Sequence, residues 1–249
     1  MPFTLAHPAA ILPLLKPFGR WLDVRALIIG SIAPDLSYFI LPDMAHEWTH
    51  SWLGLIGFCL PAGLAAYALY RYLLEDFTIR HFPQRFRARL SCIQGTRWRL
   101  VPASILLGSF THILWDSLTH PGPLMDKLPA LQRSYGSIGG YDILGYKILQ
   151  HGSTLLGVLV LAAVILCWYR QAPAQYDHVP TLSRTILVTG FTLPLLTAIY
   201  FAGNLGTGPW LLELQHAVGR GMHPAGTAVL LVWLGLALFE ANFKRGKEV

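Results

Sequence analysis

The sequence predicts an all-α membrane protein: a polytopic bundle of six membrane-spanning helices plus a short N-terminal helix that is partly inserted. Apolar residues make up 53% of the 249 residues and only 13% are charged, about half the charged share of soluble domains. Mean hydropathy is +0.46. Apolar runs close to the roughly 20 residues that cross a bilayer recur along the whole chain. We therefore expect one membrane-embedded domain over residues 1–249.

The spans are predicted from apolar segments that polar, Gly or Pro residues bound. The clearest are Trp52 to Leu74, Val101 to Leu118, Ser153 to Tyr169, Ser183 to Leu205 and Pro224 to Phe243. A sixth, Arg25 to Leu41, is interrupted by Pro34-Asp35. The stretch from Pro8 to Phe18 is too short to cross straight, at about 1.5 Å per residue, so we expect it to insert only partly.

Basic residues near the span ends predict the orientation, because they concentrate on the cytoplasmic side. The loop between the spans ending at Leu74 and starting at Val101 is rich in arginine, with Arg80, Arg85, Arg87, Arg89, Arg97 and Arg99. We expect this loop and the basic C-terminal tail to be cytoplasmic, in a multi-pass protein of the bacterial inner membrane. The arginines are interpreted as an orientation signal, so the expected partners are membrane lipids and not nucleic acid.

Histidines and intramembrane carboxylates indicate where chemistry would occur. His112 and Asp116 stand four residues apart, on one helix face, and can present two metal ligands or a ligand with its carboxylate partner. Asp35 lies within an apolar span, where a charge costs several kcal/mol unless it is paired or faces a polar cavity. If Gly19 to Val24 is the inner turn of a helical hairpin, His7 and Asp35 reach a similar depth near the outer side.

Several motifs carry a resemblance to a known family. They are Met-Pro-Phe-Thr-Leu-Ala-His7-Pro8-Ala-Ala, Gly30-Ser-Ile-Ala-Pro34-Asp35, Thr49-His50-Ser51, Gly108-Ser-Phe-Thr-His112-Ile-Leu-Trp-Asp116-Ser-Leu-Thr119-His-Pro-Gly122 and Gln150-His151-Gly152-Ser153. Over at least residues 1–170 the chain resembles a family of bacterial integral membrane proteins known as domain of unknown function 4184. The resemblance is most specific in the first half of the chain.

The order of these motifs is also similar, more distantly, to the inner-membrane metal-dependent hydrolases. That resemblance implies metal-assisted hydrolysis at a site built from matching motif positions: His7, Asp35, His50, His112 and Asp116. Two positions depart from that pattern. Ser37 replaces the second Asp of Pro-Asp-x-Asp, and the basic residue of His-Arg-x-x-Thr-His-Ser has no counterpart at Glu47.

The expected function is that of a metal-dependent membrane hydrolase near the outer face of the bilayer, acting on a lipid or phosphoester substrate. Imidazole and carboxylate ligands suit a divalent metal, zinc first, though manganese or iron accept them too. The candidate ligands outnumber the usual three of a catalytic zinc. Either two metals are held, or Asp35 or Asp116 acts as an outer partner and general base.

Three other interpretations use the same residues. His46-Glu47-Trp-Thr-His50 reads H-E-x-x-H, the zinc-peptidase signature, in which His46 and His50 are ligands and Glu47 is the general base. The intramembrane aspartates and His112 also suit a non-enzymatic ion or proton transporter. Finally, a purely structural cluster would hold helices together through hydrogen bonds between Asp and His side chains.

Overall fold

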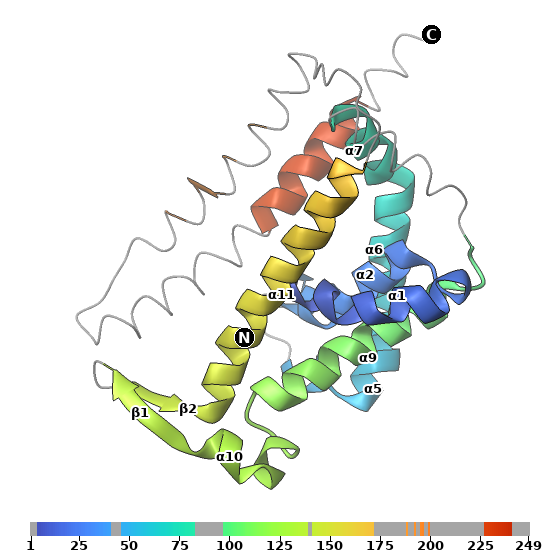
Figure 1. The fold of residues 1–249 in the computed structure, drawn as a ribbon. Helices are drawn as coiled ribbons and strands as arrows, with labels where there is room; N and C mark the ends of the chain where they lie inside the picture. Colours follow the sequence, from blue (N-terminus) through green and yellow to red (C-terminus); the bar gives the residue numbers. More distant parts are fainter. Residues whose placement is uncertain are drawn as a thin grey trace, which may run out of the picture. The chain divides into compact units, whose positions relative to one another are not determined.

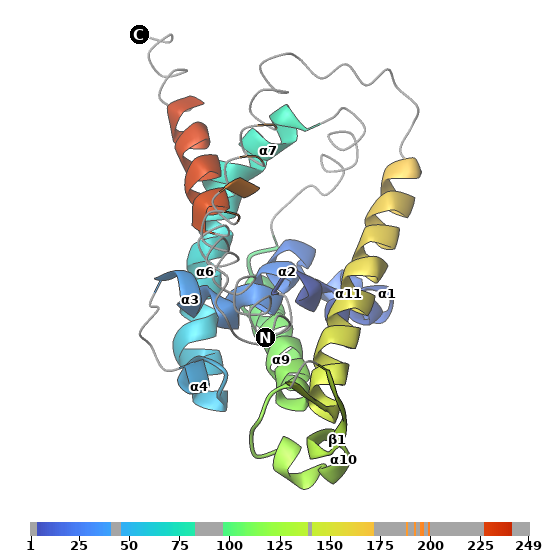
Figure 2. The ribbon, with the colours of Figure 1, turned by 90° about the vertical axis from the view of Figure 1, so that its left-hand side faces the viewer.

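The computed structural model describes residues 4–40, 46–82, 97–138, 141–171 and 227–240, together with the single positions 188, 192, 195, 196 and 199. These parts are helical apart from one two-stranded antiparallel hairpin (Figure 1, Figure 2). The chain divides into two compact units. The first comprises residues 1–67 and 95–168, and the second comprises residues 68–94 and 169–249.

A helical hairpin opens the first unit, as the sequence predicts. Its elements are the 3-10 helix Thr4–Ile11, α1 (Leu12–Phe18), a 3-10 turn (Gly19–Trp21), α2 (Val24–Ile32), the 3-10 helix Ala33–Leu36 and α3 (Ser37–Ile40). Asp23 caps α2, because its carboxylate accepts a hydrogen bond from the backbone N–H of Ala26 at 3.0 Å. Pro34 stands in the 3-10 helix that separates α2 from α3. The predicted span Arg25 to Leu41 is therefore broken where the sequence indicates.

The helices α2 and α9 (Val101–Thr119) pack against each other in the first unit (Figure 1). Their backbones approach closely at two glycines: a Cβ atom on Gly30 would collide with the backbone of Ile105, and one on Gly108 with the carbonyl oxygen of Leu27. The Ser109 hydroxyl donates to the Gly30 carbonyl oxygen at 3.0 Å. This contact fixes α9 against the hairpin that carries Asp35.

Among the described residues, two helices are long and apolar enough to cross a membrane, Trp52–His81 and Gly145–Arg170. The first consists of α5 (Trp52–Gly54), a π-helical turn (Leu55–Cys59), α6 (Leu60–Leu69), a second π-helical turn (Tyr70–Leu74) and α7 (Glu75–His81); the second is α11. The 19-residue α9 is more polar, since it carries serines as well as His112 and Asp116. The described chain thus shows two candidate spans where the sequence predicts six.

The remaining predicted spans are described only in part. A helix forms at Thr227–Glu240, within the predicted Pro224 to Phe243 segment. Most of the predicted Ser183 to Leu205 segment lies outside the described residues, as do residues 83–96 of the arginine-rich loop and the C-terminal tail. The predicted loop from Thr119 to Gly152 contains ordered structure instead.

This loop region folds into small elements before the long helix. They are a 3-10 turn (Met125–Lys127), α10 (Pro129–Gln132), β1 (Ser134–Ile138) and β2 (Tyr141–Leu144), which lead into α11 (Gly145–Arg170). The strands pair antiparallel, with Ser137 opposite Asp142. The helix α11 begins at Gly145 and not at Ser153, because its first turns are polar and precede the apolar stretch from which the span is predicted.

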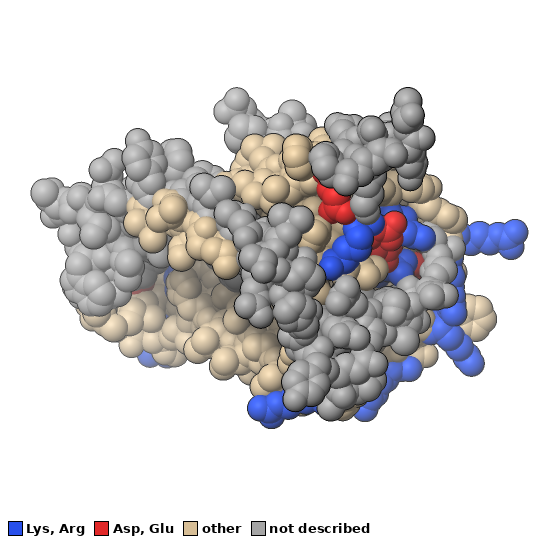
Figure 3. Space-filling view, turned by 90° about the horizontal axis from the view of Figure 1, so that it is seen from above, with Lys and Arg blue, Asp and Glu red and all other residues tan. Residues whose placement is uncertain are grey.

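In the second unit, the C-terminal helix 227–240 is held to α7 by ionic and aromatic contacts. Glu240 lies 3.0 Å from Arg80 Nε and 2.8 Å from His81 Nε2. The rings of Phe77 and Trp233 pack edge to face at 5.6 Å. On the face drawn in Figure 3, acidic side chains lie next to basic ones, while other basic side chains stand at the edge of the view. Glu240 therefore pairs with both basic residues at the end of α7.

Candidate metal centre

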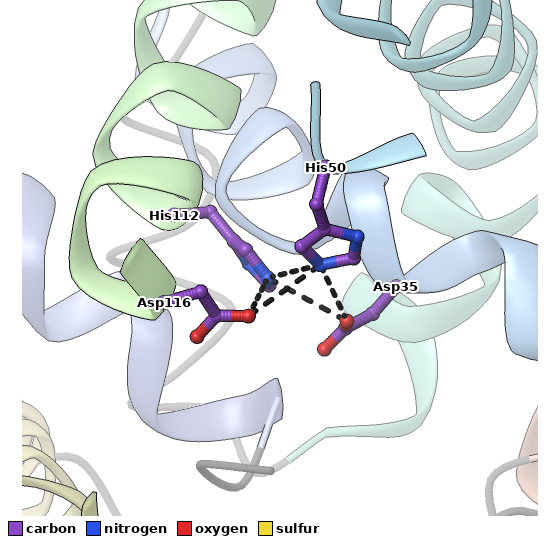
Figure 4. Close-up of side chains that lie close together, drawn as sticks. All are labelled: Asp35, His50, His112 and Asp116. Atoms are coloured by element: carbon purple, nitrogen blue, oxygen red, sulfur yellow. Dashed lines mark hydrogen bonds and ion pairs between the residues drawn. The ribbon is translucent and has the colours of Figure 1, made fainter. Parts of the chain in front are cut away.

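Four side chains in the first unit point toward one centre (Figure 4). Asp35 lies in the 3-10 helix after α2, and His50 follows α4 (His46–Thr49). His112 and Asp116 lie one turn apart on α9. One ligand atom from each residue lies within 4.8 Å of the others. Asp35, His112 and Asp116 are buried, and the His50 side chain is only 9% exposed.

Five of the six distances between these donor atoms suit ligands of one cation, and the sixth, between the oxygens of Asp35 and Asp116, is at most 4.8 Å. The Nε2 atoms of His50 and His112 are 3.3 Å apart, and each lies 3.4–3.5 Å from one oxygen of Asp35 and of Asp116. Metal bonds of about 2.0–2.2 Å give tetrahedron edges of about 3.3–3.6 Å. Direct charge-assisted hydrogen bonds would be nearer 2.7–2.9 Å. The donors are thus spaced around a shared point, which a cluster of Asp–His pairs would not require.

Outer hydrogen bonds aim these donors at the centre, as in metal sites where second partners orient the ligands. The Nδ1 atom of His112 lies 2.7 Å from the carbonyl oxygen of Ser31. Because a carbonyl oxygen can only accept, Nδ1 carries the proton and Nε2 turns its lone pair to the centre. The Thr4 hydroxyl donates to Asp35 Oδ2 at 2.6 Å. The other oxygen, Oδ1, is buried without a hydrogen-bond partner among the described residues.

The position of His50 depends on the tight junction between α4 and α5. The Ser51 hydroxyl caps α5 by accepting from the Gly54 N–H at 3.0 Å, and a Cβ on Gly54 would collide with the carbonyl oxygen of Trp48. The Cys59 thiol, in the π-helical turn, donates to the Thr49 carbonyl oxygen at 3.4 Å. The Thr49 hydroxyl lies 3.0 Å from His50 Nδ1. These contacts leave Nε2 of His50 facing the centre.

The electrostatics of His50 follow from its neighbours. Burial alone would lower its pKa, but the two carboxylates of Asp116 and Asp35, 3.4 Å away, outweigh burial and raise the pKa of His50 above its ordinary value. Two carboxylates therefore attract a positive charge to this point. A divalent cation satisfies the same attraction and competes with the proton on His50.

His7, from the first 3-10 helix, lies beside this set. Its ring stacks on that of His112 with centroids 3.6 Å apart, and its Nε2 atom is 3.6 Å from Asp116 Oδ1. Burial, with His112 close by, lowers the pKa of His7 to about 4, so the ring is neutral near pH 7. The structure thus gathers all five residues that the hydrolase resemblance implies.

Comparison with known proteins places these motifs in a family. The sequence model of the family Domain of unknown function (DUF4184) matches residues 1–239. The chain belongs to this family. The match confirms the resemblance that the motifs around His7, Asp35, His50 and His112 indicate. No curated protein and no solved structure matches the chain.

Two residues of this DUF4184 protein, His46 and Glu47, are needed only for the H-E-x-x-H interpretation. Glu47 is exposed on α4 and is not part of the four-residue group. The His46 side chain lies outside the described residues. The helix α4 ends at Thr49, and His50 follows it. The geometry favours the two aspartates over Glu47 as the acidic members of the site.

Sequence reasoning missed the DUF4184 residues that support the ligands. Ser31 acts through its backbone carbonyl, which has no sequence signature, and Thr4 lies within a motif that drew attention only to His7. Gln150 belongs to another recognised motif; it is 1% exposed, and its amide nitrogen is 3.1 Å from His120 Nε2. Ser37, which replaces an Asp of the distant family, donates to the Pro34 carbonyl oxygen at 3.0 Å and faces the Thr49 hydroxyl.

Proposed function

We propose that this DUF4184 protein is a metal-dependent membrane hydrolase whose cation, zinc in the first instance, is held by Asp35, His50, His112 and Asp116. The convergence of the four donor atoms on one point carries this proposal. When bound, a divalent cation polarises a phosphoryl or carbonyl oxygen and lowers the pKa of water toward neutrality. The motif order that resembles inner-membrane metal-dependent hydrolases supports the same reaction class.

The protein residues have separable roles in this proposal. His50 and His112 supply neutral nitrogen donors, and the tautomer of His112 is fixed by the Ser31 carbonyl. The carboxylates of Asp35 and Asp116 would balance the charge of the cation, and a carboxylate oxygen of this pair that is not bound to a cation would take a proton from water. Glu47 is exposed and outside the group, which argues against a base role there.

The membrane placement is supported by the surface of α11. Its apolar side chains are largely exposed, at 47–63% of their area for Leu155, Leu156, Leu159, Ile165 and Leu166. A surface of this kind favours association in water, whereas lipid chains match it. We propose six spans in the bacterial inner membrane, with the arginine-rich loop and C-terminal tail in the cytoplasm. The site then lies near the outer face, where a lipid or another phosphoester is the substrate.

Paired carboxamide substitutions test the proposal. Asp116→Asn and Glu47→Gln each remove one carboxylate at nearly constant size, and the purified variants are compared for zinc content and for hydrolysis of bis(4-nitrophenyl) phosphate. We expect Asp116→Asn to lose zinc or to lose activity by about 10²- to 10⁴-fold, the usual effect of removing an essential acid–base group. Glu47→Gln should be close to the parent protein.

Other results would favour the alternatives. If Glu47→Gln is inactive and Asp116→Asn is active on a peptide substrate, the H-E-x-x-H peptidase is the better assignment. If zinc binds but neither phosphoester nor peptide is cleaved, while reconstituted vesicles show cation flux, the ion transporter is favoured. If the parent protein binds no metal, the better assignment is a purely structural cluster that holds the helices together.

A further inference from the structure

The ring of His7 and one oxygen of Asp116 form an unsatisfied pair next to the four-residue centre. His7 is 1% exposed, and neither of its ring nitrogens has a hydrogen-bond partner among the described residues. The same is true of Asp116 Oδ1. A buried polar group left without a partner costs about 1–3 kcal/mol. The proximity of unsatisfied groups on two different elements indicates that something binds between them.

The separation of the two atoms restricts what that ligand is. His7 Nε2 and Asp116 Oδ1 are 3.6 Å apart, which is too long for a hydrogen bond between them. A cation with bonds of about 2.0–2.2 Å to each atom spans this gap, because these are ordinary lengths for imidazole nitrogen and carboxylate oxygen. Imidazole nitrogen and carboxylate oxygen are both ordinary ligand atoms for a divalent cation. Asp116 Oδ2 already faces the first centre.

We propose that the site holds a second divalent cation, bound by His7 Nε2 and Asp116 Oδ1, with the Asp116 carboxylate bridging the two cations. The proposal rests on the first cation of the proposed function. The stacking supports it: the rings of His7 and His112 are 3.6 Å apart and within 17° of parallel. Two nearly parallel imidazoles at this spacing would hold their cations at a similar separation, in the range of the roughly 3.5–4 Å between the metals of two-metal hydrolytic sites.

The second subsite differs from the first in how many protein ligands it has. Among the described residues two protein atoms define it, against four at the first centre. His120 Nδ1 approaches Asp116 Oδ1 at 3.7 Å but lies closer, at 3.2 Å, to the Asp116 carbonyl oxygen. In this proposal, substrate oxygens complete the coordination of the second cation. Paired cations with an open subsite suit a phosphoester, whose attacking and leaving oxygens both need charge stabilisation.

Metal stoichiometry tests this inference on the full-length protein in detergent. After equilibration with zinc and removal of excess, elemental analysis should give two zinc ions per parent chain and one in His7→Gln. His151→Gln is the matched control, since His151 is exposed on α11 and outside the site; it should keep two. Two zinc ions in His7→Gln would overturn the proposal.

A second measurement reads the parent protein directly. Loaded with Mn²⁺, the parent protein should give the electron paramagnetic resonance spectrum of a spin-coupled pair, whatever the behaviour of the variants. One uncoupled Mn²⁺ per parent chain, lost in His112→Ala, would overturn the second subsite and leave the proposed function intact. Absence of bound metal from the parent protein would overturn both.

Discussion

At the scale of the residue, the sequence indicated the candidate ligand side chains but not the groups that orient them. The spacing of His112 and Asp116 predicts a shared helix face. A helical hairpin with its turn at Gly19 to Val24 predicts that His7 and Asp35 reach a similar depth. In the structure, His112 Nε2 is 3.5 Å from Asp35 Oδ1. The orienting partners were not predictable, because the Ser31 carbonyl and the Thr4 hydroxyl act on residues far away in the chain.

The Thr4 hydroxyl provides a prediction at this scale. Thr4→Val removes the hydrogen bond that holds Asp35 Oδ2 and so frees the carboxylate to rotate away from the centre. Loss of an outer partner typically weakens metal binding by about 10- to 100-fold, and we expect such a change in the zinc dissociation constant measured by competition with a chelator. Thr111→Val is the control, because its hydroxyl donates to the Gly108 carbonyl within the same helix. Equal effects in both variants would contradict an orienting role.

At the scale of the element, apolar runs and the polar, Gly and Pro residues that bound them located the helices. They did not locate the helix ends or the β-hairpin. Pro34 marks the interruption after α2, as predicted. The strands β1 and β2 were missed because they are short and lie between polar helical turns. The close contact of α2 with α9 was not predicted either. Gly30 and Gly108 lie in different segments, and the sequence does not show that these two segments pack together.

The glycine contact provides an element-scale prediction. Gly108→Ala places a methyl group against the Leu27 carbonyl oxygen, so α9 must shift away from α2. Overpacking of this kind costs about 1–3 kcal/mol, and it should lower the thermal midpoint and weaken zinc binding together. Gly152→Ala, on α11 with no atom within 4 Å of the added group, should leave zinc binding unchanged and the midpoint equal or higher. If Gly108→Ala binds zinc as the parent does, the helix contact does not position the site.

Metal removal provides a second prediction at the scale of the element. The centre joins the 3-10 helix of Asp35, the turn of His50 and α9, so a bound cation cross-links them. A ligand at 100 times its dissociation constant stabilises the folded state by about 2.7 kcal/mol. Zinc should raise the thermal midpoint of the parent protein by several degrees over chelator-treated samples, and should not do so for His112→Ala. A shift of the same size in His112→Ala would place the stabilising metal elsewhere.

At the scale of the whole molecule, composition predicted a helical membrane protein, and the described chain is helical with two candidate spans. The number of spans and the orientation follow from hydropathy and from basic residues, which are properties of the protein in a bilayer. The structure of the chain alone does not contain the bilayer. These features therefore stay predictions that labelling in cells addresses.

The orientation is tested by single cysteines introduced into a variant without Cys59, Cys92 and Cys167. Gln94→Cys reports the arginine-rich loop, and Ser137→Cys reports the exposed β1 strand on the opposite side. In intact cells an impermeant maleimide should label Ser137→Cys and spare Gln94→Cys until the membrane is permeabilised, because basic residues keep their loop cytoplasmic. The opposite pattern would reverse the orientation and place the site near the cytoplasmic face.

The most direct test of the central claim is zinc K-edge X-ray absorption on the purified, zinc-loaded protein. The geometry predicts a coordination shell of nitrogen and oxygen only, at about 2.0–2.2 Å, with the scattering of histidine imidazoles, and its disappearance in His112→Ala. A shell that contains sulfur at about 2.3 Å, or an unchanged spectrum in His112→Ala, would contradict a cation held by Asp35, His50, His112 and Asp116.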